Sequence, residues 1–186
     1  MDAPVIAKKA SYTASLLLMT AVVLGGCANP DDTVIKKCPA AATLPEAQTL
    51  TRFKDGTGRD LIDVNFNGKI IGITGSCSID VDEDTGEGTI EMKVRPRFEF
   101  TRGPANHDSQ LTFEYFVVLT DAASNPISEQ RLPFKSEFWT NRTVMTDKDK
   151  PIELTIPVTD WQGGDDFRVF VGFQLSREEL DYNRSR

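Results

Sequence analysis

The sequence predicts an all-β domain built from antiparallel sheets. The main observation is the alternation in residues 89–101, where every even-numbered residue from 90 to 100 is apolar and every odd-numbered one is polar or charged. A period of two places one face of a strand in a core and the other in water. Shorter runs of this kind follow about every 10–15 residues, with turn-forming residues between them and little helical periodicity.

The strands expected from this pattern begin near residue 61 and continue to residue 175. Residues 113–119 are apolar on both faces for most of their length, which is typical of a central strand. Alternation recurs in residues 152–158 and 167–175, and in weaker form in residues 61–66, 69–73 and 127–138. Pro96 cannot donate a backbone hydrogen bond, so it predicts a sheet edge or a bulge within the longest strand.

Turn-forming residues separate these strands. They are Asn67-Gly68, Asp84-Thr85-Gly86, Ser124-Asn125-Pro126 and Gln162-Gly163-Gly164. Seven or eight strands at this spacing predict an immunoglobulin-like antiparallel β-sandwich. A small closed barrel is the alternative.

The end of the chain predicts a short C-terminal helix. Ser176 is followed three residues later by Glu179, which is the pattern of a capping box. Leu180 would then face the sandwich. A second short helical turn is expected near residues 44–51, where Pro45-Glu46-Ala47 suits a first turn.

The first 26 residues predict an export signal. Lys8 and Lys9 form a basic segment, and an apolar run follows from residue 16 to residue 24 with Thr20 as its interruption. This order is typical of a signal peptide. A membrane-spanning helix needs about 20 apolar residues, and this run is about half as long. A permanent transmembrane anchor is therefore not expected.

The end of this signal, Leu24-Gly25-Gly26-Cys27, resembles the lipobox of bacterial lipoproteins. The resemblance implies that the Cys27 thiol receives a diacylglyceryl group, that cleavage follows Gly26 and that the new amino terminus is acylated. Two or more acyl chains anchor a protein stably. Ala28 in place of aspartate implies, by the lipoprotein sorting rule, the periplasmic face of the outer membrane. A secreted protein whose cysteine falls near the cleavage site by chance is the alternative.

The expected organisation is a signal peptide (1–26), an acylated tether (27–58) and a β-sandwich domain (59–186). Residues 50–61 and 170–184 resemble a group of uncharacterised alphaproteobacterial envelope lipoproteins. That resemblance implies an envelope location and carries over no activity and no catalytic residue.

Two further cysteines, Cys38 and Cys77, predict a disulfide in an oxidising compartment. Such a bridge would hold the tether against the sheet. Two independent buried thiols are the alternative. A zinc site is not expected, because the chain holds one histidine.

The balance of charge argues against nucleic acid as a partner. The chain carries 21 basic and 28 acidic residues, a formal net charge of −7, whereas nucleic-acid binding needs a basic surface. Contact with the membrane is therefore expected through the acyl chains, and a protein of the envelope is the expected partner.

One acidic run is a weak calcium candidate. Asp80, Asp82 and Asp84 occupy positions 1, 3 and 5 of an EF-hand-like loop, but the glycine falls one place late, at Gly86. A solvated hairpin turn is the alternative. His107 lies in a polar loop and is expected to be a surface residue.

These observations predict a lipid-anchored, non-enzymatic binding or assembly module of the cell envelope, without a cofactor. Two alternatives stay open: a calcium-stabilised adhesion-type module and an envelope hydrolase that uses carboxylates alone. No motif for a serine nucleophile, a phosphate loop or a dinucleotide is present in the sequence.

Overall fold

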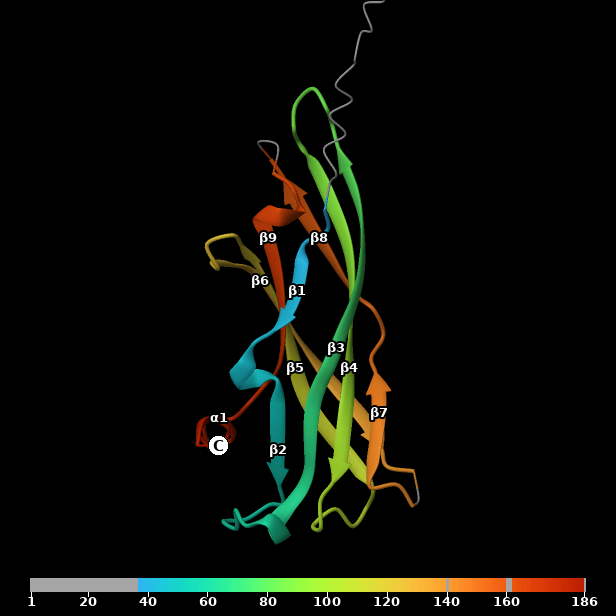
Figure 1. The fold of residues 1–186 in the computed structure, drawn as a ribbon, viewed down its shortest axis with the longest axis vertical. Helices are drawn as coiled ribbons and strands as arrows, with labels where there is room; N and C mark the ends of the chain where they lie inside the picture. Colours follow the sequence, from blue (N-terminus) through green and yellow to red (C-terminus); the bar gives the residue numbers. More distant parts are fainter. Residues whose placement is uncertain (1–36, 140, 160–161, 186) are drawn as a thin grey trace, which may run out of the picture. The chain divides into compact units, whose positions relative to one another are not determined.

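The computed structural model describes residues 37–139, 141–159 and 162–185, in which nine strands form two sheets (Figure 1). One sheet has the strand order β1-β9-β5-β6, and the other has the order β2-β3-β4-β7, with β8 also paired to β4. The strands are β1 (Ala40–Thr43), β2 (Thr49–Phe53), β3 (Val64–Val81), β4 (Gly88–Arg102), β5 (Gln110–Asp121), β6 (Pro126–Glu137), β7 (Val144–Lys148), β8 (Ile152–Val158) and β9 (Phe167–Phe173). The predicted sandwich of mainly antiparallel sheets is confirmed.

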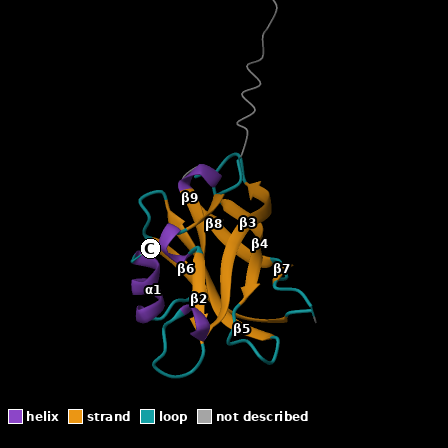
Figure 2. Ribbon diagram, turned by 60° about the horizontal axis from the view of Figure 1, so that its bottom comes forward, coloured by secondary structure: helices purple, strands orange, loops and turns teal. Residues whose placement is uncertain are grey.

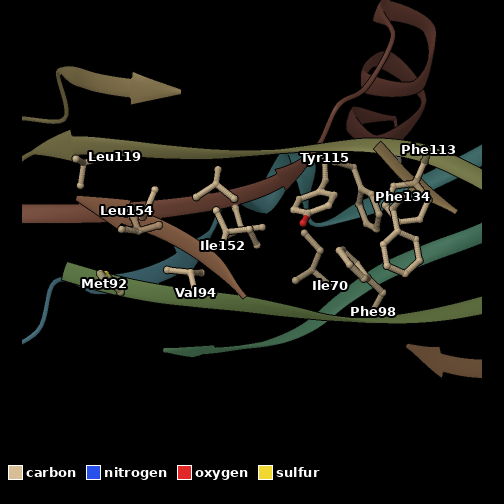
Figure 3. Close-up of a cluster of buried hydrophobic side chains, with 14 of the residues drawn as sticks. Ile70, Met92, Val94, Phe98, Phe113, Tyr115, Leu119, Phe134, Ile152 and Leu154 are labelled. Carbon is tan, nitrogen blue, oxygen red and sulfur yellow. The ribbon is translucent and has the colours of Figure 1, made fainter. Parts of the chain in front are cut away.

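The core lies between the two sheets and is rich in phenylalanine (Figure 3). Strand β4 follows the predicted alternation, since its even-numbered side chains are buried from Ile90 to Phe100. Phe98 and Phe100 meet Phe113 and Tyr115 of β5 in this layer. β5 is a central strand, as expected, because it pairs with β6 on one side and β9 on the other.

Pro96 lies neither at a sheet edge nor in a bulge of its own strand. It is buried in β4 at the position where the neighbour on one side changes, because residues 88–94 pair with β8 and residues 97–101 pair with β7. A break between two partner strands is a place where a missing backbone donor costs little. The other neighbour of β4 is β3. The register of that pairing shifts between Ile70 and Gly72, so the irregularity lies in β3 and not in β4.

The turn predicted at Asn67-Gly68 is wrong. Both residues lie inside β3, so the two weak strands predicted around them form one continuous strand. A Cβ atom at position 68 would lie 3.1 Å from Phe173 Cζ and 3.2 Å from Phe100 Cε1. Glycine at this position therefore makes room for two core rings. The predicted strand start at residue 61 is also early, since Leu61–Asp63 form a 3₁₀ turn, η2.

The predicted tether is too long. Strands β1 and β2 both lie within residues 27–58, and Leu50 of β2 is buried in the core. β1 pairs in parallel with β9 in one sheet, the expected turn follows as the 3₁₀ helix η1 (Pro45–Ala47), and β2 then joins β3 in the other sheet. Strands this short, with few large apolar residues, leave almost no periodic signal.

The C-terminal helix and the hairpin turn are confirmed. Helix α1 (Arg177–Arg184) begins with the expected capping box, in which Ser176 Oγ accepts from the Glu179 N–H and the Ser176 N–H donates to Glu179 Oε2 (Figure 2). In the β3–β4 turn, Gly86 adopts a φ of 73°, a conformation that favours glycine.

The disulfide between Cys38 and Cys77 is present, with the two Cα atoms 5.7 Å apart. Cys38 precedes β1, whereas Cys77 lies on β3, so the bridge links the first strand of one sheet to the other sheet. Cys27 and the predicted signal segment lie outside the described residues. In the described part of the chain, no helix is long and apolar enough to cross a membrane.

Candidate functional site: an apolar end and an adjoining groove

Three loops meet at one end of the sandwich. They connect β2 to β3, β4 to β5 and β6 to β7 (Figure 1). Backbone hydrogen bonds tie them together: the Gly103 N–H donates to Asn65 O at 2.8 Å, the Ala105 N–H to Val64 O at 2.9 Å and the Arg102 N–H to Thr143 O at 2.7 Å. The disulfide and the β3–β4 hairpin turn lie away from these loops, further along β3.

Large apolar side chains are exposed on two of these loops and at the start of β7. Leu61 is 73% exposed, Ile62 71%, Trp139 72% and Val144 46%. We call these four residues the apolar end. A single exposed apolar residue on a protein surface needs no explanation, but several on adjoining loops are typical of an interaction surface. Tryptophan in particular is enriched at the centres of protein interfaces.

The β4–β5 loop, at the same end of the sandwich, is held by buried polar contacts. Asn106 is buried, and its Nδ2 donates to Asn65 Oδ1 at 2.6 Å and to Gln110 O at 2.9 Å. Arg102 donates from Nε and Nη2 to the backbone oxygen of Asn106. These bonds fix the β4–β5 loop against the start of β3. The neighbouring His107 is exposed, as expected.

Asp63 fixes the turn that presents Leu61 and Ile62. Its Oδ1 lies 2.7 Å from Lys54 Nζ, and its Oδ2 accepts from the Asp60 N–H at 3.1 Å. The hydrogen bond from Lys54, followed by that from the Asp60 backbone, lowers the pKa of the Asp63 carboxyl. The carboxylate therefore stays ionised at neutral pH and keeps the turn closed.

A groove of about 790 Å³ adjoins the apolar end, between the β2–β3 loop and helix α1. Its lining residues come from 52–59 and 176–185, so the two stretches that carry the lipoprotein resemblance face each other across it. Sequence reasoning gave no reason to bring them together, because more than a hundred residues separate them.

Two ion pairs join charged side chains of the groove. Arg52 Nε lies 3.3 Å from Glu179 Oε1, where the Glu179 side chain is 9% exposed. Arg59 Nη2 lies 2.6 Å from Glu178 Oε2, and the Arg59 guanidinium also lies 5.4 Å from the centre of the Phe53 ring. These pairs hold α1 against β2 and the β2–β3 loop, and they give the groove a polar wall.

The acidic residues considered for calcium form a turn. Asp82 Oδ1 accepts from the backbone N–H groups of Asp84 and Thr85, both at 2.9 Å. The Thr85 and Asp84 backbone bonds lower the pKa of the Asp82 carboxyl. In the described ranges, no group of three or more histidine, cysteine, aspartate or glutamate side chains is arranged to hold a metal ion. The Asp82 carboxylate thus accepts hydrogen bonds from the backbone of its own turn. It is not grouped with the Asp80 and Asp84 carboxylates as a set of metal ligands.

One buried polar contact could not be foreseen from the sequence. Tyr115 is fully buried, and its hydroxyl donates to Asp149 Oδ2 at 2.7 Å. Burial, together with the bond to Asp149, raises the pKa of the Tyr115 hydroxyl above its ordinary range. The phenol stays neutral and ties the β7–β8 connection to the core.

Comparisons of the chain with protein-family models, with curated proteins and with solved structures find no match. The fold and the surface define a disulfide-linked β-sandwich with an apolar end and an adjoining polar groove.

Proposed function

We propose that the protein is a lipid-anchored binding or assembly module of the cell envelope, without enzymatic activity, that binds a protein partner through the apolar end. The observation that supports this most is the exposure of Leu61, Ile62 and Trp139, each more than 70% exposed, on loops at the same end of the sandwich (Figure 1). A partner protein with an apolar patch of its own would cover them. The groove beside them would contact the polar rim of the same partner.

The free energy expected from burying these side chains supports this choice of surface. Fully burying a leucine or isoleucine side chain contributes about 1.5–3 kcal/mol. Leu61 and Ile62 are presented by a turn that Asp63 and Lys54 already hold, so little loop ordering would oppose binding. Trp139 would add a rigid aromatic anchor, the residue type most often found at energetic hot spots.

The place where the chain enters the sandwich also supports it. Cys38 is bound to Cys77, which lies thirteen positions along β3 from Val64. At about 3.3 Å per residue, that is about 40 Å of strand. A chain anchored at Cys27 would thus enter the sandwich far from the apolar end and leave that end free for a partner on a different surface.

Lipidation is tested by replacing Cys27 with serine. Cells grown with a radioactive fatty acid are expected to label the wild-type chain, and Cys27→Ser is expected to remove the label, because the thiol is the acyl acceptor in this proposal. Cys38→Ser, which changes a cysteine of the folded domain, serves as the control and should keep the label. Equal label on Cys27→Ser and wild type would contradict the proposed anchor.

Partner binding is tested by changing the apolar end. The variant Leu61→Ser/Ile62→Ser/Trp139→Ala is expected to fold with nearly unchanged stability, since exposed residues contribute within about 0.5 kcal/mol. The three side chains are expected to contribute more than about 2 kcal/mol to the binding free energy, as hot-spot residues do. Their loss should therefore reduce recovery of the partner at least about thirtyfold. The measurement is co-purification from detergent-solubilised envelopes, with the proteins compared between variants by quantitative mass spectrometry.

The matched control is Ile127→Ser. Ile127 is 49% exposed but lies at the start of β6, outside the loops of the apolar end. It should recover the same proteins as the wild type. A partner recovered equally by the triple variant, or lost with Ile127→Ser, would contradict the proposed surface.

A further inference from the structure

Within the described residues, one edge of strand β3 has no paired strand along its second half. On the side away from β4, β2 pairs with it only from Val64 to Lys69. The ladder ends at Ile70, where Gln48 occupies both backbone groups: the Ile70 N–H donates to Gln48 O at 2.9 Å, and Gln48 Nε2 donates to Ile70 O at 3.1 Å. Among the described strands, only β4 pairs with residues 71–81.

This edge lacks the features that normally protect an edge strand. Charged residues and prolines keep exposed edges from pairing with other chains, and residues 70–79 contain neither. Except for the four-residue β1 (Ala40–Thr43), the other edge strands of the two sheets do carry them. They include Arg52 on β2, Arg131, Pro133 and Lys135 on β6, Asp147 and Lys148 on β7, and Glu153 and Pro157 on β8.

The free segment is also nearly symmetric about its centre. Residues 71–79 read Ile-Gly-Ile-Thr-Gly-Ser-Cys-Ser-Ile. If the sequence is reversed about Gly75, Ile71 falls on Ile79, Ile73 on Cys77 and Thr74 on Ser76. Ile73 and Cys77 both pack against the core, and Thr74 and Ser76 are exposed, so apolar residues meet apolar residues on one face and small polar residues meet small polar residues on the other. Cys77 also holds the bridge to Cys38, and Ile71 lies at the irregularity of β3.

We propose that β3 is a self-association surface, on which a second copy of the chain pairs in antiparallel register around a two-fold axis at Gly75. A two-fold interface requires a surface that is complementary to itself, and residues 71–79 meet that requirement in sequence. The pairing joins the two β3-containing sheets into one continuous sheet, as in strand addition to an exposed edge. Backbone hydrogen bonds supply the affinity, and the matched side chains set the register.

The sequence symmetry and the free backbone groups of β3 place the end of the paired segment at the same residue. The symmetry of the sequence ends at residues 71 and 79, because the next pair would place Asp80 opposite Ile70. The free backbone begins at the same point, since Gln48 already occupies Ile70. Gly72 has open space around the position of a Cβ atom, so a second strand can approach closely there.

The experiment uses the full-length chain carrying either of two affinity tags, with both forms produced in the same cells. One tag is captured from the detergent extract and the other is quantified. Wild-type copies are expected to co-purify. Thr74→Lys/Ser76→Lys places like charges opposite each other at both symmetry-related positions, which should weaken self-association about tenfold.

Charge reversal keeps the test independent of any loss of folding. Thr74→Glu/Ser76→Glu alone should also fail to self-associate, whereas the lysine and glutamate variants produced together should restore co-purification. Thr112→Lys is the control, because Thr112 is exposed on β5, in the other sheet, where it is paired with Lys135 of β6. Chains that share a detergent micelle by chance would be recovered equally with every variant.

Three results would overturn this inference. They are wild-type copies recovered no better than the lysine variant, a mixture of lysine and glutamate variants that does not restore recovery, and a monomeric wild type whose amides at 71–79 are nevertheless protected from hydrogen exchange. The last would mean that the edge is already covered within a single copy of the chain. None of the altered residues belongs to the apolar end, so either proposal can fail without the other.

Discussion

Replacing Phe98 by alanine is expected to destabilise the domain by about 3–5 kcal/mol. Phe98 is fully buried at the centre of the core. Five aromatic rings from β4, β5, β6 and β9 surround it at centroid distances of 5.1–5.8 Å; they belong to Phe100, Phe113, Tyr115, Phe134 and Phe173. Rings held by four strands of two sheets cannot all move to fill the space, so most of the cavity would remain.

Urea denaturation checks this prediction, with Arg97→Ala as the control. Arg97 is the neighbour of Phe98 on β4, but its side chain is exposed. Its replacement should cost within about 0.5 kcal/mol. Against a total stability of about 5–15 kcal/mol, the first change is severe and the second nearly silent. Equal losses for the two variants would contradict the two-faced strand on which the sandwich depends.

Removing the disulfide is expected to destabilise the domain by a similar amount. Cys38 and Cys77 are 39 residues apart, and in the chain-entropy model a bridge across such a loop contributes about 4 kcal/mol. The bridge also links segments of opposite sheets, so its loss frees β1 from β3. The double variant Cys38→Ser/Cys77→Ser should therefore unfold at a lower urea concentration than the wild type.

Reduction provides the matching measurement. Cys38 is exposed, so a reductant added to the wild type should lower its unfolding midpoint to that of the double variant. The same reductant should leave the double variant unchanged. A double variant as stable as the oxidised wild type would show that the bridge contributes nothing to stability.

The parts of the fold that could be predicted are those with a strong local signal. The alternation in β4 predicted a strand with one buried face, and Ser176 with Glu179 predicted the start of α1. Both follow from contacts within a strand or within one helical turn. The pairing of Cys38 with Cys77 was predictable because no other cysteine of the folded domain competes.

The errors arose where distant contacts decide the structure. Asn67-Gly68 has the composition of a hairpin turn, but Gly68 is needed opposite Phe100 and Phe173, which lie far away in the sequence. β1 and β2 are short, and their partners are β9 and β3, so their own residues carry little pattern. Tertiary packing overrides local preference in both cases.

The candidate site was not predictable for the same reason. Leu61 and Ile62 read as the start of a strand, yet they stand on an exposed turn that Asp63 and Lys54 hold closed. Trp139 gave no signal, because its importance comes from its exposure and from the loops beside it. Exposure of an apolar side chain cannot be read from composition, since most residues of this type are buried.

The most direct test of the central proposal is photo-crosslinking in intact cells, with a photoreactive aromatic residue in place of Trp139. The proposal predicts a discrete cross-linked protein band that weakens when Leu61→Ser/Ile62→Ser is added to the same chain. The same probe at Ser128, an exposed position on β6 outside the apolar end, should not give that band. An identical band from both positions, or no band from position 139, would contradict a partner bound at the apolar end.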